Sequence, residues 1–203
     1  MGRFLLIYLG FLLPACQRDV ELIDLGPLPP WQFVDQNNQP IGDVSLKGKV
    51  WAANFLFTSC PTSCPALAQA TLKLQGTIEA MLDRAQMRRV AIVSVTVDPE
   101  TDTTALLKTF AEKYHAHPLW HFARGDYAQM EKLVNVGFMQ PIIRSDRLPG
   151  GEIPKNPTPL DTAHSLRFVL VDQMGHIRGL FDQSDDGVAQ LSAAMRQLLR
   201  ANN

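Results

Sequence analysis

The sequence predicts an α/β fold in which helices cover both faces of a mixed sheet, and three observations support this. Apolar, β-branched runs alternate with stretches of helical periodicity between residues 50 and 136. Near the C-terminus two apolar runs flank a short turn and precede an amphipathic stretch. Cys60 and Cys64 lie where the first buried run gives way to a helical one. Early alternation followed by an antiparallel pair is typical of a three-layer mixed sheet.

The expected elements begin with a β-hairpin, because Trp31–Val34 and Ile41–Leu46 flank a turn rich in Asp, Asn and Pro. Pro65 suits the first turn of the helix after the cysteines, and Asp102 or Thr103 could cap the next helix. A cysteine pair at the first strand-to-helix junction makes the predicted fold thioredoxin-like. The remaining expected elements are strands at Val50–Phe57, Val90–Val97 and Pro118–Phe122, helices at Pro65–Ala85, Asp102–His115 and Asp126–Val136, a hairpin of Leu166–Asp172 with Ile177–Phe181, and a final helix at Val188–Leu199.

A long loop interrupts this order between Phe138 and Leu160. It contains five prolines and two glycines, which break both helices and strands. Loops of this length are usually functional or mobile, so we expect it to serve as a partner-docking element ahead of the C-terminal hairpin.

The bulk composition is that of one ordinary globular domain. The chain has 203 residues, of which 46% are hydrophobic and 19% charged, and its net charge is −1. This length and composition support a real core. The near-zero charge gives no indication of a nucleic-acid partner.

The N-terminus has the features of an export signal. A basic start is followed by an apolar run, Phe4–Leu13, which is shorter than the about 20 residues needed to span a bilayer. Leu13-Pro14-Ala15-Cys16 resembles the end of a bacterial lipoprotein signal, in which the cysteine is lipidated. We therefore expect a signal peptide at 1–16 with Cys16 as lipid anchor, a linker at 17–30, and one domain at 31–203 in an oxidising compartment.

The remaining two cysteines, Cys60 and Cys64, are four residues apart, and a helical first turn would place them on one face. Free N–H groups at a helix N-terminus favour thiolate over thiol. Such a pair can cycle through a disulfide or hold a soft metal ion. A purely structural bridge is the weaker interpretation, because closing so short a loop stabilises little.

Three segments resemble the Sco (SenC) family of copper-binding proteins, in order and over nearly the whole domain. They are the Cys-Pro-x-x-Cys-Pro turn of Phe57–Pro65, the strand and acidic turn of Val95–Thr103, and the segment Asp161–Ser165 followed by Val169–Asp172. Between the cysteines this chain has Thr62 and Ser63, where the family typically has acidic or apolar residues.

The resemblance implies a membrane-tethered copper chaperone. It implies one copper ion bound by Cys60, Cys64 and His164, with Asp98 a nearby acidic residue. It further implies a monomer on the periplasmic side of a bacterial membrane, acting on a copper-accepting subunit of cytochrome c oxidase or another copper protein. Two thiolates and an imidazole suit both Cu(I) and Cu(II).

Two enzyme alternatives remain open. In a thiol–disulfide reductase, Cys60 would attack and Cys64 would resolve. His164 argues for metal, because it stands where thioredoxin-like oxidoreductases carry a proline. A peroxidase is the weaker alternative, because Ala53 and Phe57 replace the proline and threonine of that motif. Three further histidines, at positions His115, His117 and His121, are interpreted as surface or packing residues.

Overall fold

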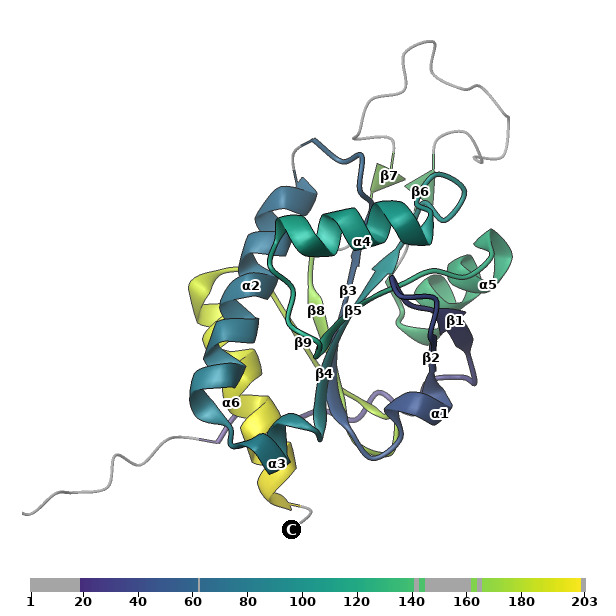
Figure 1. Cartoon of the computed structure of the whole chain (residues 1–203). Helices are drawn as coiled ribbons and strands as arrows, with labels where there is room; N and C mark the ends of the chain where they lie inside the picture. The colour runs from purple at the N-terminus through teal and green to yellow at the C-terminus, as the bar shows by residue number, and fades with distance from the viewer. Residues whose placement is uncertain (1–18, 62, 141–142, 145–161, 164–165, 202–203) are drawn as a thin grey trace, which may run out of the picture.

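The computed structural model describes residues 19–61, 63–140, 143–144, 162–163 and 166–201. Its centre is a five-stranded mixed sheet of order β5-β4-β3-β8-β9 (Figure 1). β3 (Val50–Leu56), β4 (Val90–Thr96) and β5 (Trp120–Ala123) are parallel, while β8 (Phe168–Val171) pairs antiparallel with β3 and with β9 (Ile177–Phe181). Every residue of β3 and β4 is buried, because layers cover both faces of the sheet.

Three helices cover one face: α2 (Ser63–Met81), α4 (Thr104–Lys113) and α6 (Asp185–Ala201). On this face Asn54 of β3 donates to Thr71 of α2, and the ring of Phe110 in α4 meets that of Phe122 in β5. α2 also contacts α6. The short α3 (Arg84–Met87) leads from α2 into β4.

The opposite face is covered by α5 (Tyr127–Lys132), which continues as a π-helix, η1 (Leu133–Gly137), and by the N-terminal hairpin. Phe138 packs its ring against Phe55 and Trp51 of β3. Neighbouring residues of a strand point to opposite faces, so Phe55 and Asn54 mark the two sides of the sheet. The predicted three-layer, thioredoxin-like architecture is therefore confirmed.

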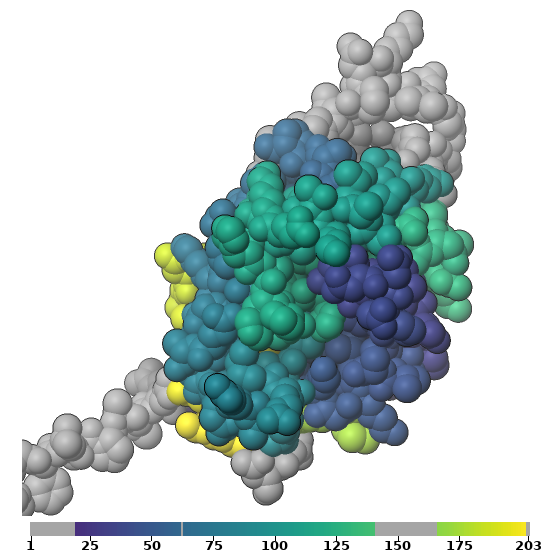
Figure 2. Space-filling model, in the orientation of Figure 1, coloured from purple at the N-terminus to yellow at the C-terminus, as the bar shows by residue number. Residues whose placement is uncertain are grey.

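The N-terminal hairpin differs from its prediction in the second strand. β1 (Gln32–Val34) pairs with β2 (Pro40–Gly42), as expected, but Asp43–Leu46 forms the short helix α1. The strand prediction for Asp43–Leu46 was wrong because Asp43 ends the pairing: its carboxylate accepts the N–H of Trp31, and its own N–H reaches the Trp31 carbonyl. Figure 2 shows this hairpin, in purple, on the surface between α4 and α5.

Part of the predicted linker is hydrogen-bonded to the domain. The N–H groups of Ile23 and Leu25 donate to the carbonyls of Arg178 and Ile177, and that of Leu28 to Gly175. Asp24 pairs with His176 at 3.0 Å. Residues 23–28 therefore run along the edge strand β9 and the turn that precedes it.

The other element boundaries fall close to the predicted ones, except that the helix predicted at Pro65–Ala85 ends at Met81 and Ala85 lies in the separate helix α3. The third strand begins at Trp120 rather than Pro118, and Thr103 caps α4 through Leu106 N–H. The loop predicted at Phe138–Leu160 contains β6 (Ile143–Arg144), which pairs antiparallel with β7 (Thr162–Ala163); the rest of it lies outside the described residues. In the described part of the chain no helix is long and apolar enough to span a bilayer.

Candidate metal-binding and redox site

The two cysteines meet at the junction of β3 and α2, as the sequence predicts. Cys60 follows the turn at the end of β3, and its N–H donates to the carbonyl of Phe57. Cys64 is the second residue of α2, and its N–H points at the sulfur of Cys60, 3.4 Å away. The hydroxyl of Ser63 lies 3.3 Å from the same sulfur. No disulfide joins the two cysteines, and the first turn of α2 brings the N–H of Cys64 and the hydroxyl of Ser63 to the sulfur of Cys60.

The two thiols differ in their environment. Cys64 has no exposed surface, whereas Cys60 is 7% exposed. Burial raises the pKa of Cys64 well above its ordinary value of 9.0, and proximity to Cys60 adds to the rise, although a hydrogen bond at Phe57 opposes it. The expectation that the helix N-terminus favours thiolate at both positions is wrong for Cys64, because the rise in pKa caused by dehydration exceeds the lowering by the hydrogen bond at Phe57.

An acidic turn lies beside the cysteine turn, because the parallel strands β3 and β4 end at the same edge of the sheet. Asp98, half-buried, closes this turn: its carbonyl accepts the N–H groups of Thr101 and Asp102, and its own N–H donates to Thr96 Oγ1. The backbone of Asp98 thus has the turn-forming role that its position before Pro99 suggests.

Sequence reasoning missed the contact made by Asp102, which it considered only as a possible helix cap. The carboxylate is fully buried and accepts hydrogen bonds from Thr58 and Thr96. Burial raises its pKa, while the hydrogen bonds from the two threonines oppose the rise. The only sequence signal was a threonine near the end of each strand, which is too weak to identify the contact.

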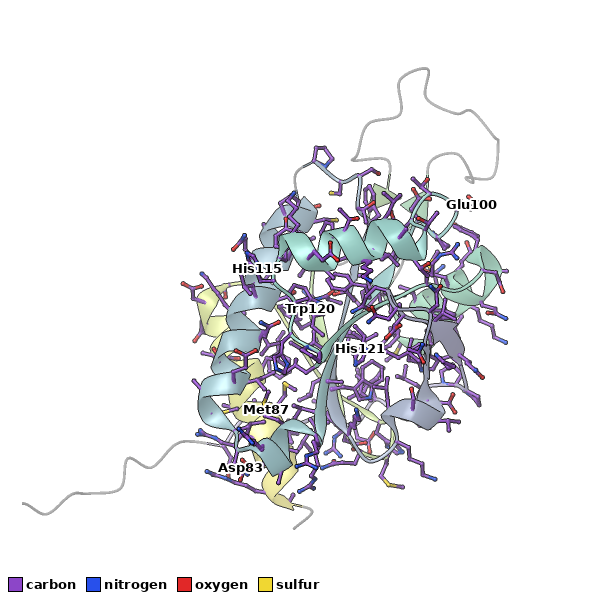
Figure 3. All side chains as sticks on the ribbon, viewed as in Figure 1. Asp83, Met87, Glu100, His115, Trp120 and His121 are labelled. Atoms are coloured by element: carbon purple, nitrogen blue, oxygen red, sulfur yellow. The ribbon has the colours of Figure 1, made fainter. Side chains whose placement is uncertain are left out.

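The other predicted residues divide into two groups. His164 and Cys16 lie outside the described residues. His115 and His117 are exposed, and His121 is partly buried with its Nδ1 3.3 Å from Asp35. Figure 3 labels His115 and His121. Among the described residues no group of three or more His, Cys, Asp or Glu side chains is placed to hold a metal ion.

The fold and the cysteine junction define the class: a thioredoxin-like domain with a dithiol at the end of its central strand. The sequence profile of the SCO1/SenC family matches residues 27–200. This chain belongs to the SCO1/SenC family.

Two relatives illustrate the sequence similarity. A SCO1 protein homolog of Bacillus subtilis is 39% identical over 106 residues, which is half of each chain. A Stutzerimonas stutzeri protein, whose name designates it as copper-binding, is 31% identical over 152 residues, covering 75% of this chain and 67% of its own.

Two solved structures are similar throughout the fold. A SCO1/SenC family lipoprotein of Bacillus anthracis superposes with a TM-score of 0.72 at 29% identity, covering 86% of this chain and 96% of its own. BsSco, described as having a disulfide switch and as belonging to the Sco family of cytochrome c oxidase assembly proteins, gives 0.70 at 26% identity, covering 88% and 96%.

Proposed function

We propose that this protein is a copper chaperone. It binds one copper ion through Cys60, Cys64 and His164 and delivers the ion to the binuclear copper centre of cytochrome c oxidase. The observation that carries the proposal is the juxtaposition of two cysteines at the β3–α2 junction, with the N–H of Cys64 directed at the sulfur of Cys60.

The environment of Cys64 supports a metal ion as the partner of this pair. Its thiol is fully buried and resists ionisation, so a thiolate there needs a compensating charge. A soft cation such as copper supplies that charge and prefers sulfur ligands.

The strand register supports His164 as the third ligand. Ala53 of β3 is paired with Val169 of β8, and the two strands are antiparallel. Phe168, four residues after His164 in the sequence, therefore begins β8 at the end of the sheet where β3 leads into Cys60. The relatives named for copper binding and for cytochrome c oxidase assembly support the cargo and the target.

A copper titration of the reduced chain tests the ligand set. We expect one copper(II) per chain with a sulfur-to-copper charge-transfer band. The band should disappear in Cys60→Ser and Cys64→Ser, and copper(II) binding should weaken at least tenfold in His164→Ala. His117→Ala, which changes an exposed histidine, is the matched control. Unchanged affinity in all three ligand variants would refute the proposal.

The second candidate is a thiol–disulfide reductase, which the proximity of Cys60 and Cys64 and the disulfide switch described for BsSco favour. Cys60 would attack a target disulfide and Cys64 would resolve the mixed disulfide, so the target gains two thiols as this pair is oxidised. His164→Ala discriminates the candidates, because a reductase keeps its rate in that variant whereas a copper carrier loses copper(II).

The proposed location is the periplasmic side of a bacterial membrane, held by a lipid on Cys16. Support comes from the signal-like N-terminus and from the Bacillus anthracis relative, which is described as a lipoprotein. Metabolic labelling with a radioactive fatty acid should mark the parent chain and leave Cys16→Ser unlabelled; equal labelling would exclude this anchor.

A further inference from the structure

A buried carboxylate connects the cysteine turn to the acidic turn. Asp102 has no exposed surface. One carboxylate oxygen, Oδ1, accepts the hydroxyl of Thr58 at 2.5 Å, and the backbone N–H of Thr58 lies 3.1 and 3.2 Å from the two oxygens. Thr58 stands two residues before Cys60 and two after the end of β3, so this contact holds the cysteine turn near its start.

The other oxygen of Asp102 holds the neighbouring turn. Thr96 Oγ1 accepts the N–H of Asp98 at 3.1 Å and donates its own proton to Asp102 Oδ2 at 2.5 Å. The backbone N–H of Asp102 also donates to the Asp98 carbonyl. One side chain therefore connects two loops that the sequence separates by about forty residues.

This arrangement is poorly explained as a device for stability alone. A carboxyl group with no exposed surface is costly to keep charged, and its pKa is raised despite the threonine hydrogen bonds. The cap of α4 is Thr103, whose hydroxyl accepts from Leu106, so Asp102 is not needed there. What remains is its geometric effect on the two turns.

We propose that Asp102 is a positioning residue that sets the place of Cys60 relative to Cys64 and to the acidic turn at Asp98, and thereby tunes the reactivity of the cysteine pair. The expected effect on copper binding rests on the proposed function, whereas the expected effect on the thiol–disulfide equilibrium does not. Without the anchor, the turn at Thr58 relaxes and the sulfur of Cys60 loses its alignment with the N–H of Cys64. The dithiol form is then less stabilised, and the disulfide is favoured.

The test is the equilibrium of the full chain with dithiothreitol, in a Cys16→Ser background so that only Cys60 and Cys64 report. One dithiothreitol disulfide is reduced for each protein disulfide formed, and alkylation counts the remaining thiols. We expect Asp102→Asn and Thr58→Val each to shift the equilibrium toward the protein disulfide at least threefold, about 14 mV for a two-electron couple. Thr58→Ser, which keeps the hydroxyl, should restore the parent value.

Two controls separate positioning from stability. Thr103→Ala removes the cap of α4 and should lower stability without shifting the disulfide equilibrium. Asp126→Asn changes a carboxylate that caps α5 and should also leave the equilibrium unchanged. The double variant Asp102→Asn with Thr58→Val should shift the equilibrium no further than either single variant, because both remove the same contact.

The proposal is overturned if Thr58→Val, folded by circular dichroism, shifts the equilibrium less than threefold, or if Thr103→Ala shifts it as much. If Asp102→Asn fails to fold, the disulfide equilibrium of Thr58→Val decides whether the proposal holds. With copper added, the charge-transfer band of Thr58→Val should move in position or intensity. If the parent chain binds no copper, the proposed function fails, while the dithiothreitol equilibrium still decides the role of Asp102.

Discussion

The unequal burial of the two thiols predicts that Cys60 reacts much faster than Cys64. The variants Cys60→Ser and Cys64→Ser, each with Cys16→Ser, leave one thiol at a time. Only the thiolate is alkylated by iodoacetamide, so the rate at a given pH follows the ionised fraction and the access of the reagent to the sulfur.

The burial of Cys64 determines the expected ratio of the two alkylation rates. A thiol with the ordinary pKa of 9.0 is about 1% thiolate at pH 7, and each further unit of pKa removes another factor of about ten. Burial raises the pKa of Cys64 well above that value, and its sulfur has no exposed surface. Replacing Cys60 removes a smaller contribution to the raised pKa of Cys64 and leaves dehydration, the largest contribution, in place. We expect Cys64 to be alkylated at least about tenfold more slowly than Cys60 at pH 7.

The assay is quenched alkylation followed by mass spectrometry, repeated across the alkaline range. The same variants unfolded in urea are the control, because there the two thiols should react at similar rates. Equal rates in the folded variants, or a midpoint for Cys64 at or below pH 9, would refute the reasoning and would remove the argument that Cys64 needs a compensating cation.

Three further predictions concern the frame around the site. Phe138→Ala should lower the free energy of unfolding by about 3–5 kcal/mol in urea titrations, because the ring is fully buried against two aromatic rings of β3. Burial lowers the pKa of His121 below 6.5 although Asp35 opposes this, so stability present above pH 6.5 is lost as the pH falls. His121→Gln should therefore lose less unfolding free energy than the parent between about pH 7.5 and 5.5. Gly42→Ala should destabilise by about 1–3 kcal/mol, because its new methyl group would clash with the backbone oxygen of Trp31.

Each of these has a matched comparison. Val136→Ala truncates an exposed neighbour of Phe138 and should change stability by less than about 0.5 kcal/mol. His117→Gln, the same substitution at an exposed histidine, is the comparison for His121→Gln. Gly76→Ala, in α2 with open space around it, should stabilise by about 0.5–1 kcal/mol. A loss in Gly76→Ala equal to that in Gly42→Ala would contradict the steric argument.

The elements that were predicted well carry local signals. Val50–Leu56 and Val90–Thr96 are buried at every position, and segments that are almost entirely apolar indicate such buried strands. Asp43–Leu46 failed because its conformation depends on Trp31, twelve residues earlier in the chain. A pattern of apolar residues contains no information about such a partner.

The sequence alone determined the order of the main strands and helices, the four-residue spacing of the cysteines and the likeness to the family, because these are carried by local sequence patterns. Only the tertiary structure decided that Cys64 is dehydrated and that Asp102 reaches Thr58, forty-four residues away. Dehydration and long-range hydrogen bonds depend on which atoms the whole fold brings together, and the spacing of residues along the chain does not specify them.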